Sequence, residues 1–322
     1  MRAELDDQLF APTADTPALL SIFTLGFQGR HRVVLDALGP KYQAWWRTLD
    51  TWSQQLCTDV VNWSLKEEAH GQAKHVVHIV CSQNSSWSPP RLTLDDALDF
   101  LHRPYRLLVE NAHADGAFVL SMAKPEERTF LEKRIEREWF EIETCGGIGG
   151  LCMRANVLGQ KPRESLRCSV MFDCDAMEPG VPSIQARAAK EACDGVLHYH
   201  MLQRRAIENY LPLSVLRYWC GGKKGKEARQ RKAKVRAFSN LSPSQRHHLH
   251  MKGGLEKDNK LNGPPRMLYA ALNKSIRARL SKGFGSKIAE LFSHDIGEVE
   301  LKKDGGWDEL RPFLDGLIER VR

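Results

Sequence analysis

The stretch LRCSVMFDCD at residues 166–175 decides the fold class of this chain. A short apolar run that ends in polar residues is typical of a buried strand in a mainly parallel sheet. Asp173 and Asp175 close the run at a spacing of two, which points both carboxylates the same way from the strand end. Two like charges side by side are costly unless a cation neutralises them, and Mg²⁺ or Mn²⁺ prefers oxygen ligands. A pair of acids in a solvated loop, or capping the next helix, is the alternative that this stretch leaves open.

A second apolar strand upstream also ends in an acid. The run YRLLV precedes Glu110, and a strand-to-helix turn containing Asp115 follows it. Further along, helical patterns alternate with strand-like runs, and the strand-like run 139–145 leads into a GGIGG turn at 146–150. This alternation predicts an α/β fold with a mainly parallel sheet flanked by helices. The carboxyl ends of parallel strands share one edge, so we expect Glu110 to meet Asp173 and Asp175 if their strands are neighbours.

The chain divides into three expected regions. Residues 1–92 predict a helix-rich accessory domain that contains Trp45, Trp46, Trp52 and Trp63 and one strand-like run, HVVHIVCS at 75–82. Clustered aromatic residues are typical of a core, whereas tryptophans on the surface would mark a partner interface. Residues 93–220 carry the acids and form the expected catalytic domain. Residues 221–322 predict a basic segment followed by a helical region.

Composition excludes several classes of protein. No run approaches the ~20 apolar residues that a membrane span needs, and the first residues carry acids where a signal peptide would carry bases. The eight cysteines include no CxxC pair, which argues against disulfides and structural zinc. A net charge of +7 suits a polyanionic partner without proving one. We therefore expect a cytoplasmic protein with no membrane partner.

The order of four motifs resembles the Toprim domain. The motifs are LLVENAHAD, GGIGG, VMFDCDAMEPG and LQRRAIENYLP, and they span about residues 103–215. This domain is shared by topoisomerases, primases and the nucleases of the overcoming-lysogenization-defect (OLD) family, and the last motif is closest to the OLD-like branch. The resemblance implies a Toprim-like sheet with helix-rich N-terminal and C-terminal additions.

The resemblance also implies roles for individual acids. It assigns divalent-metal binding, with two Mg²⁺ or Mn²⁺ ions, to Glu110, Asp173 and Asp175, and it makes Glu208 the acid that completes the cluster. Asp115 matches the acid that follows the first glutamate, although it lies in a longer turn here and Asn111 replaces the usual glycine. The chain has no GxxxxGK[ST] motif, so the ATPase of full-length OLD proteins would have to be a separate partner protein.

A basic segment follows the acids. The run GGKKGKEARQRKAKVR at 221–236 holds candidates for contacts to a phosphate backbone, namely Lys223, Lys224, Lys226, Arg229, Arg231, Lys232, Lys234 and Arg236. A solvated charged helix is the alternative. Lys252 is a candidate for neutralising charge near a scissile phosphate. The nearby His247, His248 and His250 could bind a transition metal, although such a run is more often polar surface.

These features predict a metal-dependent endonuclease that cuts DNA or RNA such as tRNA. The resemblance further implies an effector of a bacterial anti-phage defence or toxin system, and it leaves a homodimer open. A primase-like or topoisomerase-like enzyme would need a nucleotide site or a nucleophilic tyrosine, and Tyr210 fits a packing residue better. The non-enzymatic alternative is a nucleic-acid-binding scaffold with a degenerate Toprim fold. The GGIGG run matches neither a Rossmann motif nor a P-loop, so we expect a tight turn there.

Overall fold

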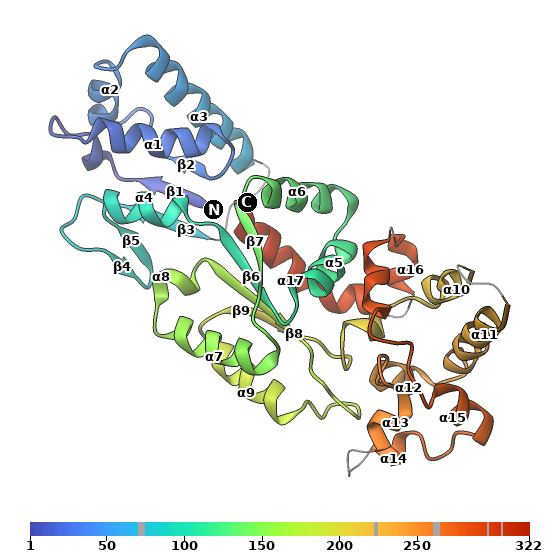
Figure 1. Cartoon of the computed structure of the whole chain (residues 1–322). Helices are drawn as coiled ribbons and strands as arrows, with labels where there is room; N and C mark the ends of the chain where they lie inside the picture. Colours follow the sequence, from blue (N-terminus) through green and yellow to red (C-terminus); the bar gives the residue numbers. More distant parts are fainter. Residues whose placement is uncertain (70–74, 222–224, 260–264, 295, 304) are drawn as a thin grey trace.

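The computed structural model describes residues 1–69, 75–221, 225–259, 265–294, 296–303 and 305–322. It is an α/β protein with two mainly parallel sheets flanked by helices, which confirms the predicted fold class (Figure 1). Within the described ranges, no helix combines the length and the apolar character needed to cross a membrane.

The N-terminal sheet has the order β2-β1-β3-β5-β4. Its strands are β1 (Arg2–Leu5), β2 (Arg32–Val34), β3 (Val76–Ile79), β4 (Ser86–Trp87) and β5 (Pro90–Leu92). All neighbouring pairs are parallel except β4 and β5. The sequence predicted β3 alone, because strands of two to four residues are too short to show the alternation that identifies a strand.

Helices cover this sheet and complete the first core. They are η1 (Asp7–Phe10), α1 (Thr16–Phe27), α2 (Pro40–Trp46), α3 (Thr51–Ala69) and α4 (Leu94–His102). Trp45 is buried in this core, whereas Trp52 is 70% exposed. Thr93 caps α4 by accepting a hydrogen bond from the backbone N–H of Asp96. The expected boundary at 92 and 93 falls inside this core, because α4 packs Phe100 into it.

The central sheet has the order β7-β6-β8-β9, and all its pairs are parallel. Its strands are β6 (Tyr105–Val109), β7 (Phe140–Thr144), β8 (Cys168–Phe172) and β9 (His198–Met201). The sequence predicted β6, β7 and β8 to within a few residues. β6 and β8 are direct neighbours, with Leu108 opposite Val170. The condition for the acids to converge is therefore met.

Helices lie on both faces of the central sheet. Leu107 and Val109 point into a core shared with α5 (Ala112–Met122), α6 (Pro125–Glu136) and α17 (Gly306–Val321). Leu108, Val170 and Phe172 point to the opposite face, where α7 (Ile148–Gly159) and α9 (Ile184–Cys193) pack, and the short α8 (Pro162–Ser165) precedes β8 (Figure 1). Successive strand residues thus alternate between two buried faces, which explains the continuous apolar runs in the sequence.

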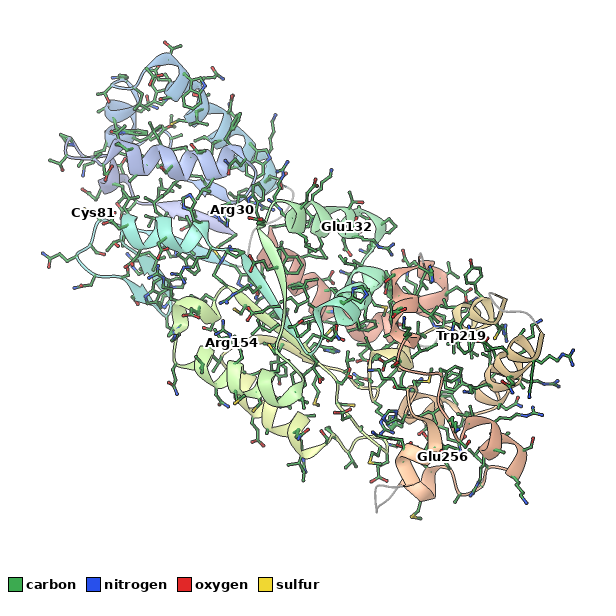
Figure 2. All side chains as sticks on the ribbon, viewed as in Figure 1. Arg30, Cys81, Glu132, Arg154, Trp219 and Glu256 are labelled. Carbon is green, nitrogen blue, oxygen red and sulfur yellow. The ribbon has the colours of Figure 1, made fainter. Side chains whose placement is uncertain are left out.

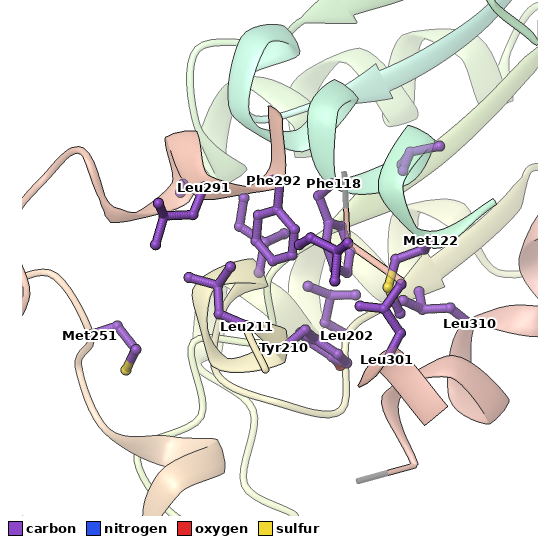
Figure 3. Close-up of a cluster of buried hydrophobic side chains, with 14 of the residues drawn as sticks. Phe118, Met122, Leu202, Tyr210, Leu211, Met251, Leu291, Phe292, Leu301 and Leu310 are labelled. Atoms are coloured by element: carbon purple, nitrogen blue, oxygen red, sulfur yellow. The ribbon is translucent and has the colours of Figure 1, made fainter. Parts of the chain in front are cut away.

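The C-terminal region is helical, as predicted, and packs beside the central sheet (Figure 1). Its elements are η2 (Ile207–Tyr210), α10 (Leu213–Gly221), α11 (Gly225–Ser239), α12 (Pro243–His248), α13 (Gly254–Asn259), α14 (Pro265–Leu268), α15 (Lys274–Leu280), η3 (Ile288–Ser293) and α16 (Glu298–Lys302). Figure 3 shows the apolar cluster that joins this region to α5. In it the ring of Phe118 lies 5.3 Å from Tyr210 and 5.0 Å from Phe292, measured between centroids. Tyr210 is 2% exposed, so its predicted packing role is confirmed.

Candidate active site

Three elements bring the predicted acids together at the carboxyl edge of the central sheet. Glu110 follows β6 and Asp173 follows β8, and the backbone N–H of Asp173 donates to Glu110 Oε1 over 3.2 Å. Asp173 Oδ1 in turn accepts from the backbone N–H of Ile207 over 3.1 Å, at the start of η2. This contact fixes η2, and with it Glu208, against the end of β8. The meeting of Glu110 and Asp173 that the strand pattern predicted is thus present, and Glu208, which only the Toprim resemblance implied, lies beside them.

Asp175 occupies a strained position beside this group. Its φ angle is 49°, in the left-handed region that residues other than glycine seldom adopt. Its backbone N–H donates to the carbonyl of Arg205 over 2.9 Å, which ties the end of β8 to the loop before η2. The surrounding protein removes part of the water around its carboxyl and so raises the pKa of Asp175. The positive charges of Arg205, His250 and Lys252 act to lower that pKa.

Asp115 is held close to the first glutamate. Its Oδ2 accepts from the backbone N–H of Asn111 over 2.8 Å, and the Asp115 side chain is buried. Asn111 itself caps α5, because its Oδ1 accepts from the backbone N–H groups of His113 and Ala114. The residue that departs from the Toprim pattern therefore has a local structural use, and Asp115 keeps its place beside the acids.

Glu208 and Lys252 form an ion pair across the site. Lys252 Nζ lies 2.8 Å from Glu208 Oε1; the carboxylate side chain is 2% exposed and the lysine side chain 48%. Burial acts to lower the pKa of Lys252, but the attraction and hydrogen bond of Glu208, with Asp173 and Asp115 behind it, raise that pKa instead. The structure thus places Lys252 at the acids, where the sequence predicted a cation.

The acids crowd one another electrostatically. Burial raises the pKa of Glu110 to about 7, and repulsion from Asp175 and Asp115 adds to this rise. Burial, with repulsion from Glu208, raises the pKa of Asp115 to about 6. Burial and then repulsion from Glu110 and Glu208 raise the pKa of Asp173 well above its usual value. A group of carboxylates in this state gains most from a bound cation.

The donor chemistry of the acids fits a hard divalent cation. Every candidate ligand is a carboxylate, which is the ligand type that Mg²⁺ and Mn²⁺ prefer. Among the residues that the structure describes, no three or more His, Cys, Asp or Glu side chains are already set to hold a metal ion together. The Glu208–Lys252 ion pair gives one physical reason, since it draws Glu208 toward the lysine.

A buried ion pair supports the loop that carries Glu208. Arg205 lies 2.7 Å from Asp258, and both side chains are at least nine-tenths buried. Asn209 Nδ2 donates to the carbonyls of Arg246 and Leu249 over 2.8 and 3.0 Å. The sequence pattern gave roles to Glu208 and Tyr210 in RRAIENYLP but none to Arg205 and Asn209. Two adjacent arginines directly before the apolar Ala206 and Ile207 were the available signal.

The predicted tight turn at 146–150 is present at Gly146 and Gly147, whereas Ile148, Gly149 and Gly150 form the first turn of α7. Gly146 and Gly147 have φ angles of 73° and 92°, and α7 begins directly after them. The turn presents the backbone N–H of Ile148 to the Glu110 carboxylate, which this hydrogen bond helps to keep ionised. A Cβ atom on Gly150 would lie 1.9 Å from the carbonyl oxygen of Cys145, so only glycine fits there.

The basic segment is the helix α11, whose described cations divide between two sides. Lys226, Arg229, Lys232 and Arg236 are exposed at helical spacing, and we call these four residues the α11 stripe. Arg231 instead pairs with Glu227 and stacks on Trp219, whose ring centroid is 4.1 Å from the guanidinium carbon. Figure 2 shows Trp219 within the C-terminal helical region. Lys234 turns inward and donates to the carbonyl of Gly283. The predicted Lys223 and Lys224 lie outside the described residues.

The histidine run is not the polar surface that was the sequence-based expectation. His248 is 5% exposed, and burial lowers its pKa to about 4. His247 and His250 are partly buried. The expectation was wrong at His248 because α12 packs against the loop before η2, where Arg205 donates to the His248 carbonyl over 3.1 Å. No transition-metal group involving these histidines exists within the described chain.

Comparisons of the chain with protein-family models, with curated proteins and with solved structures found no match.

Proposed function

We propose that this protein is a metal-dependent endonuclease that hydrolyses phosphodiester bonds of nucleic acid. The observation that supports the proposal best is the meeting of Glu110, Asp173 and Glu208, delivered by three separate elements, with Lys252 paired to the group. A capping or solvated-loop role does not account for several acids gathered in one partly buried group, since bringing like charges together away from water is costly. Asp175 and Asp115 extend the same group.

The divalent ions would be held by Glu110, Asp173, Asp175 and Glu208, with Asp115 beside them. Bound there, such ions activate a water and stabilise the negative charge that develops on the phosphate. The chain's own backbone orients these ligands: the N–H groups of Asp173 and Ile207 each hold one carboxylate oxygen of their neighbour.

Lys252 would lower the electrostatic repulsion between the acids and a negatively charged nucleic acid. Its ammonium group is half-exposed at the rim, while its partner Glu208 is buried beneath it. A cation in this position can stabilise the negative charge of a non-bridging phosphate oxygen. The α11 stripe would contact the backbone of the same nucleic acid away from the cut, which gives affinity that depends on salt and little on sequence. DNA and RNA such as tRNA are both compatible substrates.

The test is cleavage of plasmid DNA and of total tRNA with Mg²⁺, with Mn²⁺ and with a chelator. Asp173→Asn keeps the size of the side chain and removes its charge, and Asp194→Asn removes an exposed acid that pairs with Lys190 on α9 as a matched control. We expect metal-dependent cutting by the wild type and the control, and its loss in Asp173→Asn. Cutting that persists in Asp173→Asn, or in the chelator, would refute the proposal.

The biological setting stays a prediction from the Toprim resemblance. That prediction is an effector of a bacterial anti-phage defence or toxin system, with a separate ATPase as partner. A complex with such an ATPase, and its effect on the cleavage rate, would be the measurement that addresses it.

A further inference from the structure

A cavity of about 570 Å³ lies beside the end of β8. Its lining includes apolar side chains at Val181, Pro182 and Leu202 and the side chains of Cys174 and His248. Pockets that take small organic groups have volumes of roughly 300 to 1,000 Å³ and a mainly apolar lining with a few polar groups. The cavity therefore has the size and lining to take a planar heterocycle.

The cavity and the acids share one short segment of chain. Cys174 lines the cavity and lies between Asp173 and Asp175 in the sequence. Successive side chains at a strand end point to opposite sides, so the Asp173 carboxylate and the cavity beside Cys174 lie on two sides of the end of β8. The Cys174 thiol donates to the carbonyl of Arg204 over 3.0 Å, which closes the inner wall. When one nucleotide of a strand lies at the acids, the next nucleotide can therefore reach the cavity.

His248 supplies a polar group without a protein partner. His248 is among the residues that line the cavity and is more than nine-tenths buried, and within the described chain neither of its ring nitrogens has a hydrogen-bond partner. Its backbone is held in place, because its carbonyl accepts from Arg205 over 3.1 Å. Glu309, another polar residue of the lining, is already engaged by the Tyr210 hydroxyl. Buried polar groups are normally paired, so an unpaired imidazole beside a cavity points to a ligand.

We propose that this cavity binds an unpaired nucleobase of the substrate, next to the nucleotide that is cut, and that His248 hydrogen-bonds to the edge of that base. A neutral imidazole offers one donor and one acceptor, which matches the mixed edge of a nucleobase. The inference rests on the proposed nuclease function and narrows its substrate. In a duplex the pairing edge of each base is occupied, so the favoured substrate is a single strand or a loop.

The experiment compares binding of a labelled single-stranded oligonucleotide with binding of its duplex, by fluorescence anisotropy in a chelator. His248→Leu removes the polar edge at similar size, and Val181→Trp fills the cavity from a wall position that is 53% exposed. His294→Leu, at an exposed histidine on the end of η3, is the matched control. We expect both cavity variants to lose about tenfold in single-strand affinity, equivalent to about 1.4 kcal/mol. The duplex affinity of both variants, and the single-strand affinity of the His294→Leu control, should equal those of the wild type.

A second measurement separates a ligand contact from a structural role. If the role of His248 is to bind a ligand, His248→Leu should melt at the same temperature as the wild type or higher, because the substitution removes an unpaired buried polar group. A lower melting temperature together with normal single-strand binding by Val181→Trp would overturn the inference, as would equal losses for single strand and duplex.

The outcomes also distinguish this inference from the proposed function. Binding is measured in a chelator and needs no cleavage. Metal-dependent cutting by the wild type with unchanged single-strand affinity in both cavity variants would refute the base pocket and leave the nuclease. Weakened single-strand binding in the variants, with no cutting by the wild type under either metal, would leave the base pocket and refute the nuclease.

Discussion

Neutralising Glu110 should stabilise the metal-free protein at alkaline pH. The change is Glu110→Gln, which keeps the size of the side chain and an oxygen that can accept from the backbone N–H of Asp173, now 3.2 Å away. Burial first, and then repulsion from Asp175 and Asp115, raises the pKa of Glu110 from 4.5 to about 7. A difference of that size between the unfolded and the folded chain corresponds to about 3 kcal/mol of unfolding free energy.

The direction of the effect follows from which state holds the proton. Below pH 4.5 the Glu110 carboxyl is protonated in both states, so it carries no cost. Between pH 4.5 and about 7 the unfolded chain loses this proton first, and the wild type therefore loses stability as the pH rises. The glutamine variant has no such proton to lose. Its advantage over the wild type should grow by about 3 kcal/mol between acid and alkaline pH.

Urea denaturation of both proteins at pH 4.5 and at pH 8, in a chelator, measures this difference. Glu141→Gln, at an exposed glutamate on the neighbouring strand β7, is the control for the loss of one charge. Added Mg²⁺ should then raise the stability of the wild type at pH 8 more than that of Glu110→Gln, because bound metal removes the repulsion. An advantage of Glu110→Gln that is the same at both pH values would show that the acids do not carry the electrostatic cost described above.

Three further predictions test the support of the site. Asp258→Asn should lower the unfolding free energy by about 3 to 5 kcal/mol by leaving Arg205 buried and unpaired, and thermal or urea denaturation would show it; a loss below 1 kcal/mol would contradict the buried pair. Charge reversal at Arg229 and Lys232 should weaken nucleic-acid binding and reduce the slope of log affinity against log salt by about 2, whereas an unchanged slope would exclude the α11 stripe from the interface. Alanine at Gly150 would place its Cβ 1.9 Å from a carbonyl oxygen, so we expect a large fall in melting temperature; a melting temperature equal to that of the wild type would show that the turn can shift.

Local patterns in the sequence were enough to predict the strands of the central sheet that carry the acids. The apolar runs before Glu110 and Asp173 predicted β6 and β8, and Thr93 and Ser183 cap α4 and α9 by accepting hydrogen bonds from backbone N–H groups. Each of these features depends on residues within one turn or one strand of each other. Their physical cause is the fixed geometry of strands and helix ends, which does not depend on the rest of the fold.

The N-terminal sheet shows where local patterns fail. Its strands are two to four residues long, and one pair runs antiparallel. So few residues cannot display an alternation of polar and apolar side chains. Hydrogen bonds to neighbouring strands stabilise them instead, and the sequence could not show those contacts.

The sequence by itself determined that acids end two buried strands and that a basic helix follows them. Only the tertiary structure decided that β6 and β8 are neighbours, that Lys252 pairs with Glu208, and that His248 is buried beside a cavity. The physical reason is that each of these facts joins residues far apart in the chain. Such contacts form when apolar faces pack and loops close, and their free energy depends on the whole fold and not on neighbours in sequence.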